Sequence, residues 1–158
     1  IDIYGGGEDI WGARDQFRFV YKQVSGDADV SVKVVGLDDV HAYTKAGIMA
    51  RASLDADSAH VLINVFPSGG LELGSRESAG AAMVAESPGQ TTIPGARLRM
   101  VRKGDEITTY YAKGDGADWT EAGKRKIPGL GKKVYIGLAV LSHDKAELAK
   151  ASFADIRW

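Results

Sequence analysis

The sequence contains no cysteine, and this absence removes several kinds of chemistry. Disulfide bonds, catalytic thiolates and cysteine-ligated metals are all excluded. The only asparagine, Asn64, lies outside any N-glycosylation sequon. A chain of 158 residues can bury roughly 70% of the surface of its unfolded form, so it needs no covalent staples. We expect a single domain over residues 1–158 with one core.

The sequence also lacks an excess of charge of either sign. Lys and Arg number 20 against 21 for Asp and Glu, so no net field attracts nucleic acid or an anionic membrane. The longest basic cluster, residues 124–126, is typical of a solvated strand edge. No hydrophobic run has the length of a membrane span, and no signal peptide is visible. We therefore expect neither nucleic acid binding nor membrane insertion.

What the sequence has instead is glycine, with 20 residues spread between short alternating segments. In residues 45–51 and 60–66, small or β-branched side chains alternate with a mixed set that includes Lys45 and Phe66. This pattern predicts a hairpin whose apolar face needs a second layer. The fold class predicted is all-β, a two-sheet antiparallel β-sandwich of about ten strands.

Further segments with strand-like sequence lie on both sides of this hairpin. The small-residue stretch 79–94 is the predicted crossing between the two sheets. Residues 144–150 have the composition of a helix, but we predict that the end of the chain is a strand beside the first one. The other predicted strands are residues 1–4, 17–22, 29–35, 70–77, 97–102, 106–112 and 134–141.

Polar and aromatic residues on the mixed face of the hairpin suggest a carbohydrate-binding site. Sugars are bound by aromatic faces and by planar polar side chains that reach their hydroxyls. The parity of three neighbouring strands places four such side chains on one face, and two aromatic residues could rim it from loops. The candidate residues are Arg51, His60, Asn64, Arg76, Tyr43 and Trp11. The alternatives are a cross-strand polar ladder for the first four, and packing in the core or at a turn for Trp11.

Catalytic signals are weak by comparison. Glu72 and Glu77 differ in strand parity and cannot flank one glycosidic bond. His143 follows Ser142, whose side chain points to the opposite face, so we expect His143 to be structural and to bond a loop carbonyl. Neither G-x-S-x-G nor H-E-x-x-H occurs. No catalytic residue is predicted.

A metal site is the remaining alternative. Calcium takes clustered loop oxygens, and the loop that carries Asp55 and Asp57 offers them without the spacing of an EF-hand. Acidic residues in turns also serve to bind local backbone N–H groups. One structural calcium at Asp55 and Asp57 is therefore the only cofactor considered.

Several motifs, taken together and in order, resemble a known family. They are DIWG at 9–12, DQFRFVY at 15–21, KAGIMAR at 45–51, DG and WT within 115–120, and GLAVLSHD at 137–144. The sequence is similar to the concanavalin A-like β-sandwich family named after the yeast regulation of enolase protein, which is related to laminin G-like modules. Members usually have a further strand before the position of Ile1. The resemblance implies a jelly roll, lectin-like and commonly appended to secreted bacterial glycoside hydrolases or other surface proteins, but it supplies no agreed set of binding residues.

These observations favour a non-catalytic carbohydrate-binding module that tethers an appended domain or a cell surface to a poly- or oligosaccharide. Because the chain begins with Ile1 rather than Met, we expect a fragment of a longer protein, secreted or on a bacterial cell surface and possibly linked to a catalytic domain. A structural or protein-interaction β-sandwich is the alternative, and a glycoside hydrolase or lyase is a third.

Overall fold

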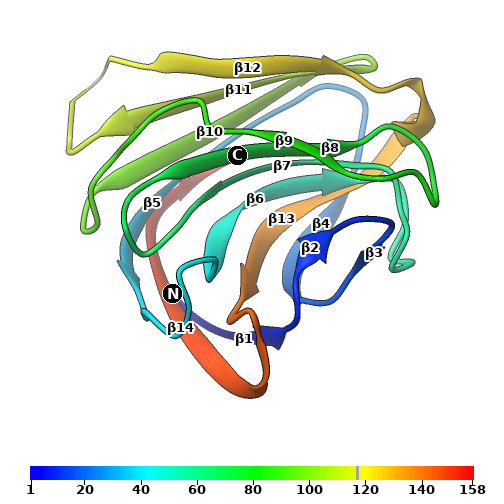
Figure 1. Cartoon of the computed structure of the whole chain (residues 1–158). Helices are drawn as coiled ribbons and strands as arrows, with labels where there is room; N and C mark the ends of the chain where they lie inside the picture. Colours follow the sequence, from blue (N-terminus) through cyan, green and yellow to red (C-terminus); the bar gives the residue numbers. More distant parts are fainter. Residues whose placement is uncertain (117) are drawn as a thin grey trace.

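The computed structural model describes residues 1–116 and 118–158, and it consists of two stacked antiparallel sheets (Figure 1). The first sheet has the strand order β1-β14-β5-β10-β11-β12, and the second has the order β4-β13-β6-β7-β8-β9. A small hairpin, β2-β3, does not pair with the strands of either sheet. The predicted all-β, two-sheet sandwich is confirmed. The first seven strands are β1 (Asp2–Gly7), β2 (Ile10–Trp11), β3 (Arg14–Asp15), β4 (Arg18–Ser25), β5 (Ala28–Leu37), β6 (Lys45–Arg51) and β7 (His60–Val65).

The second half of the chain continues the same two sheets. The small-residue stretch does hold the crossing, because β9 lies in the second sheet and β10 in the first. A short 3-10 helix, η1 (Pro128–Leu130), precedes β13. The remaining strands are β8 (Leu71–Arg76), β9 (Val84–Glu86), β10 (Ala96–Lys103), β11 (Glu106–Lys113), β12 (Thr120–Lys126), β13 (Lys133–Leu141) and β14 (Asp144–Arg157).

The structure corrects the sequence interpretation in two places. The described residues form fourteen strands rather than about ten, partly because β2 and β3 have only two residues each. The segment with helix-like composition, residues 144–150, is the first half of the long strand β14. Pairing with β1 and β5 outweighs its helix propensity. The prediction that the chain ends as a strand beside the first one is confirmed, with Ile3 opposite Ala151.

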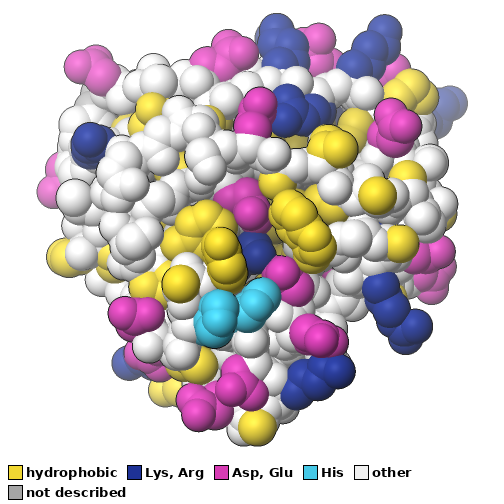
Figure 2. Space-filling model, viewed as in Figure 1, with side chains coloured by type: hydrophobic (Ala, Val, Ile, Leu, Met, Phe, Trp, Pro, Cys, Tyr) yellow, Lys and Arg dark blue, Asp and Glu magenta, His cyan; other side chains and the backbone are white. Residues whose placement is uncertain are grey.

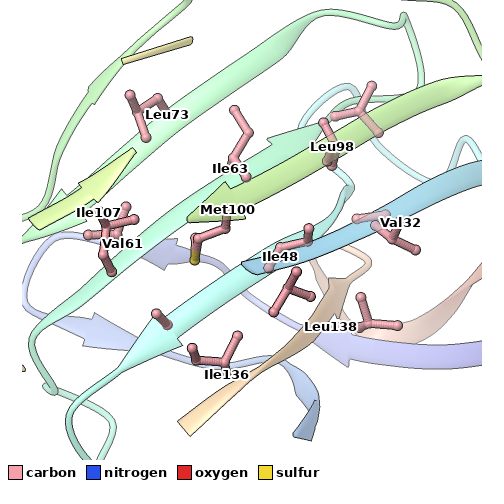
Figure 3. Packing of buried hydrophobic residues seen from close by; sticks show 14 of the residues in the cluster. Val32, Ile48, Val61, Ile63, Leu73, Leu98, Met100, Ile107, Ile136 and Leu138 are labelled. Carbon is pink, nitrogen blue, oxygen red and sulfur yellow. The ribbon is translucent and has the colours of Figure 1, made fainter. Parts of the chain in front are cut away.

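The main core lies between the two sheets (Figure 3). The second sheet contributes Ile48, Val61 and Ile63, which the alternation placed on one face, and the first sheet contributes side chains such as Val32 and Leu98. These residues are almost completely buried. Burial of apolar surface on this scale is the dominant favourable contribution to folding.

A second apolar cluster covers part of the outer face of the second sheet. Ile10 from β2 and Met83 from the loop before β9 pack there against Met49 and Leu62. This cover contributes to the burial of every residue of β6, β7 and β8, whichever way its side chain points. Phe17 and Phe19 pack against the edge of the same cluster. Within the described residues, no helix is long and apolar enough to cross a membrane.

Candidate functional site

The outer face of the second sheet is an array of cross-strand rows, read from the registers of β13, β6, β7 and β8. Residues directly opposite each other on neighbouring strands have adjacent side chains. We call three of these rows the charged row, the apolar row and the open row. On β6, β7 and β8 their members are Arg51, His60 and Arg76 in the charged row; Met49, Leu62 and Gly74 in the apolar row; and Gly47, Asn64 and Glu72 in the open row, and β13 continues the three rows with Tyr135, Gly137 and Ala139.

The charged row is closed by Asp15 of β3. Arg76 binds this carboxylate through two nitrogens, with Nη1–Oδ2 and Nη2–Oδ1 distances of 2.8 Å each. Arg51 Nη1 lies 3.1 Å from Oδ2, and His60 Nδ1 lies 3.6 Å from the same oxygen. The three side chains of the row are at most 2% exposed. A buried ion pair of this kind requires every partner to be in place.

The remaining donors of the two arginines bind backbone carbonyls of the surrounding loops. Arg51 donates from Nε to the carbonyl of Ser53 and from Nη2 to that of Asp55. Arg76 donates from Nε to the carbonyl of Ala81 and from Nη2 to that of Gly12. The charged row thus fastens the β2-β3 hairpin and two loops to the sheet, which is a structural role.

This arrangement overturns half of the predicted binding set. Arg51, His60 and Arg76 do share one face, as their parity predicted, but the expectation that this part of the face is accessible is wrong. The hairpin lies on it, and its Asp15 satisfies both guanidinium groups. The hairpin and its Asp15 stand between these side chains and any ligand.

Burial also fixes the protonation of His60. Desolvation lowers its pKa to about 4, and the neighbouring Arg76 and Arg51 act in the same direction against the attraction of Asp15. The imidazole is therefore neutral at pH 7. Asp15 is left to pair with two permanent cations rather than three.

The open row differs because three of its buried polar atoms make no hydrogen bond within the part of the chain that the structure describes. Neither the Oδ1 nor the Nδ2 of Asn64 has a hydrogen-bond partner within the described part of the chain, and the same is true of Glu72 Oε1. Asn64 is fully buried and Glu72 is 9% exposed. On β6, a Cβ at Gly47 would lie 2.1 Å from the Ile63 carbonyl oxygen and 2.8 Å from the Asn64 Cβ, so only glycine lets β7 approach this closely. Buried polar groups without partners are rare in folded proteins and call for an explanation.

Beside the open row, Lys45 lies between carboxylates and aromatic rings. Its Nζ is 2.5 Å from Asp9 Oδ1 and 3.8 Å from Glu72 Oε1. The same atom lies 6.0 Å from the ring centre of Tyr43 and 5.7 Å from that of Phe66. These two rings meet edge to face at 5.8 Å. Burial raises the pKa of the Glu72 carboxyl group, and the charge of Lys45 opposes this effect.

These side chains frame a depression that we call the hollow, made up of Asp9, Tyr43, Lys45, Asn64, Phe66 and Glu72. Figure 2 shows a recessed basic side chain on this face, with acidic side chains beside it, hydrophobic ones on both flanks and histidine at the lower rim. The main-chain positions of Lys45 and Phe66 follow from β6 and the end of β7. The sheet therefore holds the floor of the hollow, and Tyr43 from the preceding loop forms one wall.

Histidines form the rim of the hollow. His41 and His143 stack with their ring centres 4.2 Å apart, and His143 Nδ1 lies 3.6 Å from Asp9 Oδ2. Among the residues that the structure describes, this nitrogen has no hydrogen-bond partner. The expected bond from His143 to a loop carbonyl is therefore wrong. Burial lowers the pKa of His143.

Three residues of the predicted set remain accessible or face the hollow. Tyr43 is 55% exposed and forms part of the hollow, and Asn64 lies at its floor. Trp11 is 51% exposed, so it is not a core residue. It lines a neighbouring pocket of about 650 Å³, which shares Asp9 with the hollow and His143 with its rim.

The sequence interpretation missed three residues of the hollow. Lys45 and Phe66 share the face of Asn64 by parity, and a lysine inside a short apolar strand was the available signal for a special role. Asp9 gave no such signal, because it reaches Lys45 across 36 positions of sequence. Glu72 was considered only as a catalytic group.

The loop proposed to hold calcium makes local bonds. The backbone N–H of Asp55 donates to the Ser53 hydroxyl at 3.2 Å, and the carbonyl of Asp57 accepts from the N–H of Gly80. No third histidine or carboxylate joins Asp55 and Asp57 in a metal-like group within residues 1–116 and 118–158. Calcium at this loop stays a prediction.

Comparison with known proteins identifies the fold. No protein-family model matches the sequence, and no curated protein matches it. A functionally unknown protein from Saccharomyces cerevisiae is similar in structure, with a TM-score of 0.74 and 14% identity over 99% of this chain and 85% of the yeast chain. The GH43 protein BlXynB from Bacillus licheniformis gives a TM-score of 0.69 and 16% identity over 96% of this chain, which spans 31% of that enzyme.

A carbohydrate-binding module is also among the similar structures. CBM66 from Bacillus subtilis gives a TM-score of 0.55 and 16% identity, with 96% of this chain and 93% of the module covered. At these identities the comparisons concern the fold alone. The protein has the two-sheet β-sandwich jelly-roll fold that these structures share.

Proposed function

We propose that the protein is a non-catalytic carbohydrate-binding module and that it binds a poly- or oligosaccharide in the hollow. The observation that carries this proposal is the pair of unpartnered polar side chains, Asn64 and Glu72, beside two aromatic rings. Leaving buried polar atoms unpaired costs about 1–3 kcal/mol each. A ligand that supplies the missing hydrogen bonds recovers this cost on binding.

The chemistry of the hollow suits sugar hydroxyl groups. A hydroxyl both donates and accepts, so it can give a hydrogen bond to Glu72 and exchange one with the Asn64 amide. Tyr43 and Phe66 offer apolar ring surface for the C–H groups of a pyranose. Ligand sites commonly combine apolar walls with a few such polar groups.

A glycosidase remains less well supported, although the hollow contains two carboxylates. Hydrolases place two carboxyl groups about 5–9.5 Å apart, on either side of the scissile bond. Asp9 and Glu72 both contact Lys45 Nζ, at 2.5 and 3.8 Å. The ammonium group therefore takes up the space between them where a glycosidic oxygen would have to lie. This geometry favours binding without hydrolysis.

The similar structures support the wider role that we propose. One of them is a carbohydrate-binding module, and another is a much longer GH43 protein, of which this chain matches about a third. We propose that the module tethers an appended domain, which could be catalytic, or a cell surface to its glycan in a secreted or surface-exposed bacterial protein. On its sequence motifs, we propose that the chain belongs to the concanavalin A-like family named after the yeast regulation of enolase protein; the similarity to the yeast structure supports the shared fold.

A structural or protein-interaction role is the second candidate. Val20 and Tyr21 on the edge strand β4 are 41% and 44% exposed, and Val84 on the opposite edge strand β9 is 62% exposed. Exposed apolar residues on edge strands offer a surface for a protein partner.

A glycan array separates these candidates. The wild type should bind a subset of glycans, and Asn64→Leu and Tyr43→Ala should each weaken that binding at least tenfold. Tyr4→Ala is the matched control, because Tyr4 is 57% exposed against 55% for Tyr43 but lies on β1, in the other sheet. Binding that is absent across the array, or unchanged in both hollow variants, would contradict the proposal. Reducing-end release from a bound glycan would instead support an enzyme.

A further inference from the structure

The hollow contains one cation, and that cation is already neutralised. Lys45 Nζ contacts the carboxylates of Asp9 and Glu72, at 2.5 and 3.8 Å. Its other neighbours are the uncharged rings of Tyr43 and Phe66. Lys45 is 2% exposed, so little of its charge is free to act on a ligand.

Three basic side chains lie near the rim, His143, Lys145 and Arg14, and all three line the neighbouring pocket that contains Asp9. Burial lowers the pKa of His143 and so disfavours its charged form. Lys145, the next cation along the chain, binds Glu8 at 2.9 Å. The balance of fixed charges around the hollow is therefore neutral or slightly negative.

From this balance we infer that the hollow selects an uncharged sugar that presents two adjacent hydroxyl groups, and that it rejects uronates and other acidic sugars. The inference rests on the proposed function and narrows it to a ligand class. A ligand carboxylate placed here would lie close to Asp9 and Glu72, which already share Lys45 as their partner, and like charges at short range in a partly buried site repel strongly.

The preference for adjacent hydroxyl groups follows from the strand register. Asn64 and Glu72 lie directly opposite each other on β7 and β8. Side chains in that relation start about 5 Å apart, so their polar ends can converge on neighbouring oxygens of one ring. The amide can donate and accept, whereas the carboxylate accepts, and two vicinal hydroxyls match this combination.

The test uses pairs of oligosaccharides that differ only in charge. β-1,4-Mannohexaose is compared with hexamannuronate, and cellohexaose with its C6-oxidised form, on an array that also carries other neutral and acidic glycans. Affinities are measured by calorimetry at low salt, where electrostatic discrimination is largest. We expect the glycans that bind to be neutral, and the neutral member of a bound pair to bind at least tenfold more tightly than its acidic counterpart.

A charge variant shows whether Asp9 and Glu72 cause the discrimination. The double substitution Asp9→Asn, Glu72→Gln keeps the size of both side chains and leaves Lys45 without a carboxylate partner. In this variant the ratio of neutral to acidic affinity should fall at least tenfold. Added salt should restore part of that ratio, because it screens the attraction between Lys45 and an acidic sugar. The matched control, Asp29→Asn and Glu106→Gln, lies on strands of the first sheet and should leave the preference unchanged.

The possible failures can be told apart. Equal or tighter binding of the acidic members, or array signals confined to acidic glycans, would overturn the inference but leave carbohydrate binding in place. A preference for neutral sugars that the double variant does not alter would also overturn it, because the two carboxylates would not be its cause. Absence of binding to every glycan would overturn the proposed function and the inference with it.

Discussion

The charged row and the open row lie on the same face of the same sheet, yet they are completed in different ways. Arg51 and Gly47, their members on β6, are four residues apart, which is about 13 Å along a strand. In the charged row, Asp15 and loop carbonyls bind both guanidinium groups. In the open row, Asn64 and Glu72 keep polar atoms without partners in the described chain.

The difference teaches that strand parity alone does not decide whether a polar face binds a ligand. The β2-β3 hairpin covers one end of the face, and there the polar residues hold the fold together. At the other end Tyr43, in the wall of the hollow, is 55% exposed, while Asn64 at its floor is buried. Polar residues that look equivalent in sequence thus divide into a structural set and a candidate binding set.

The largest effect should come from removing the acid that closes the charged row. Asp15→Asn leaves two buried guanidinium groups without a counter-charge, and breaking a buried pair in this way costs about 3–5 kcal/mol. Urea unfolding at pH 7 should show a loss of this size. Asp29→Asn, which breaks the exposed pair between Asp29 and Arg99, is the control and should cost about 0–1 kcal/mol. Equal losses in the two variants would contradict the structural role of the charged row.

The second prediction concerns acid stability. The pKa of His60 falls from 6.5 to about 4 on folding, so the folded state binds fewer protons than the unfolded state in this range. The stability that the folded protein gains from a neutral His60 is complete above pH 6.5. It is lost as the pH falls to about 4, for a total of about 3 kcal/mol. Between pH 7 and pH 4, the His60→Asn variant should lose about 3 kcal/mol less unfolding free energy than the wild type does.

The control for this pH effect is Asn64→Leu, which removes no titratable group. Its decrease in unfolding free energy between pH 7 and pH 4 should match that of the wild type. If His60→Asn shows the same decrease as the wild type, the imidazole is not held neutral by the charged row.

Regular strands were predictable from the sequence because alternation of side chains depends on local geometry. The hairpin of β6 and β7 and the inward direction of Ile48 and Ile63 follow from period two alone. Strand β14 was the ambiguous case, because its first half has helix-like composition and only its pairing with β1 and β5 makes it a strand.

The cover over the charged row could not be predicted in this way. Strands β2 and β3 have two residues each, too few for any periodic signal. Asp15 and Arg76 are separated by 61 positions, and their pairing depends on how the hairpin folds back onto the sheet. For the same reason Asn64 was placed on the correct face, whereas the roles of Asp9 and Lys45 emerged only from the three-dimensional arrangement.

A smaller effect should follow from removing the unpartnered amide of the open row. Leu has nearly the shape of Asn, so Asn64→Leu removes two unpaired polar atoms without opening a cavity. Because replacing unpaired polar groups by apolar ones is close to neutral or stabilising, unfolding free energy should stay constant or rise by about 1 kcal/mol. Glycan affinity should nevertheless fall. A loss of stability above about 1 kcal/mol would mean that the amide already has a partner in the folded protein.

The smallest effect should come from Glu72→Gln, and it should depend on pH with the opposite sign to that of His60. The pKa of Glu72 lies above its ordinary value of 4.5 because burial disfavours the carboxylate, so the folded state holds a proton that the unfolded state has already lost. The contribution of Glu72 to the unfolding free energy therefore falls as the pH rises through this range. The variant has no carboxyl group at this position and does not show this decrease. Relative to wild type, Glu72→Gln should gain unfolding free energy between pH 4 and pH 8, by less than the His60 effect because Lys45 offsets part of the burial cost. A relative loss over the same interval would show that Lys45 stabilises the carboxylate fully, and the open row would then resemble the charged row.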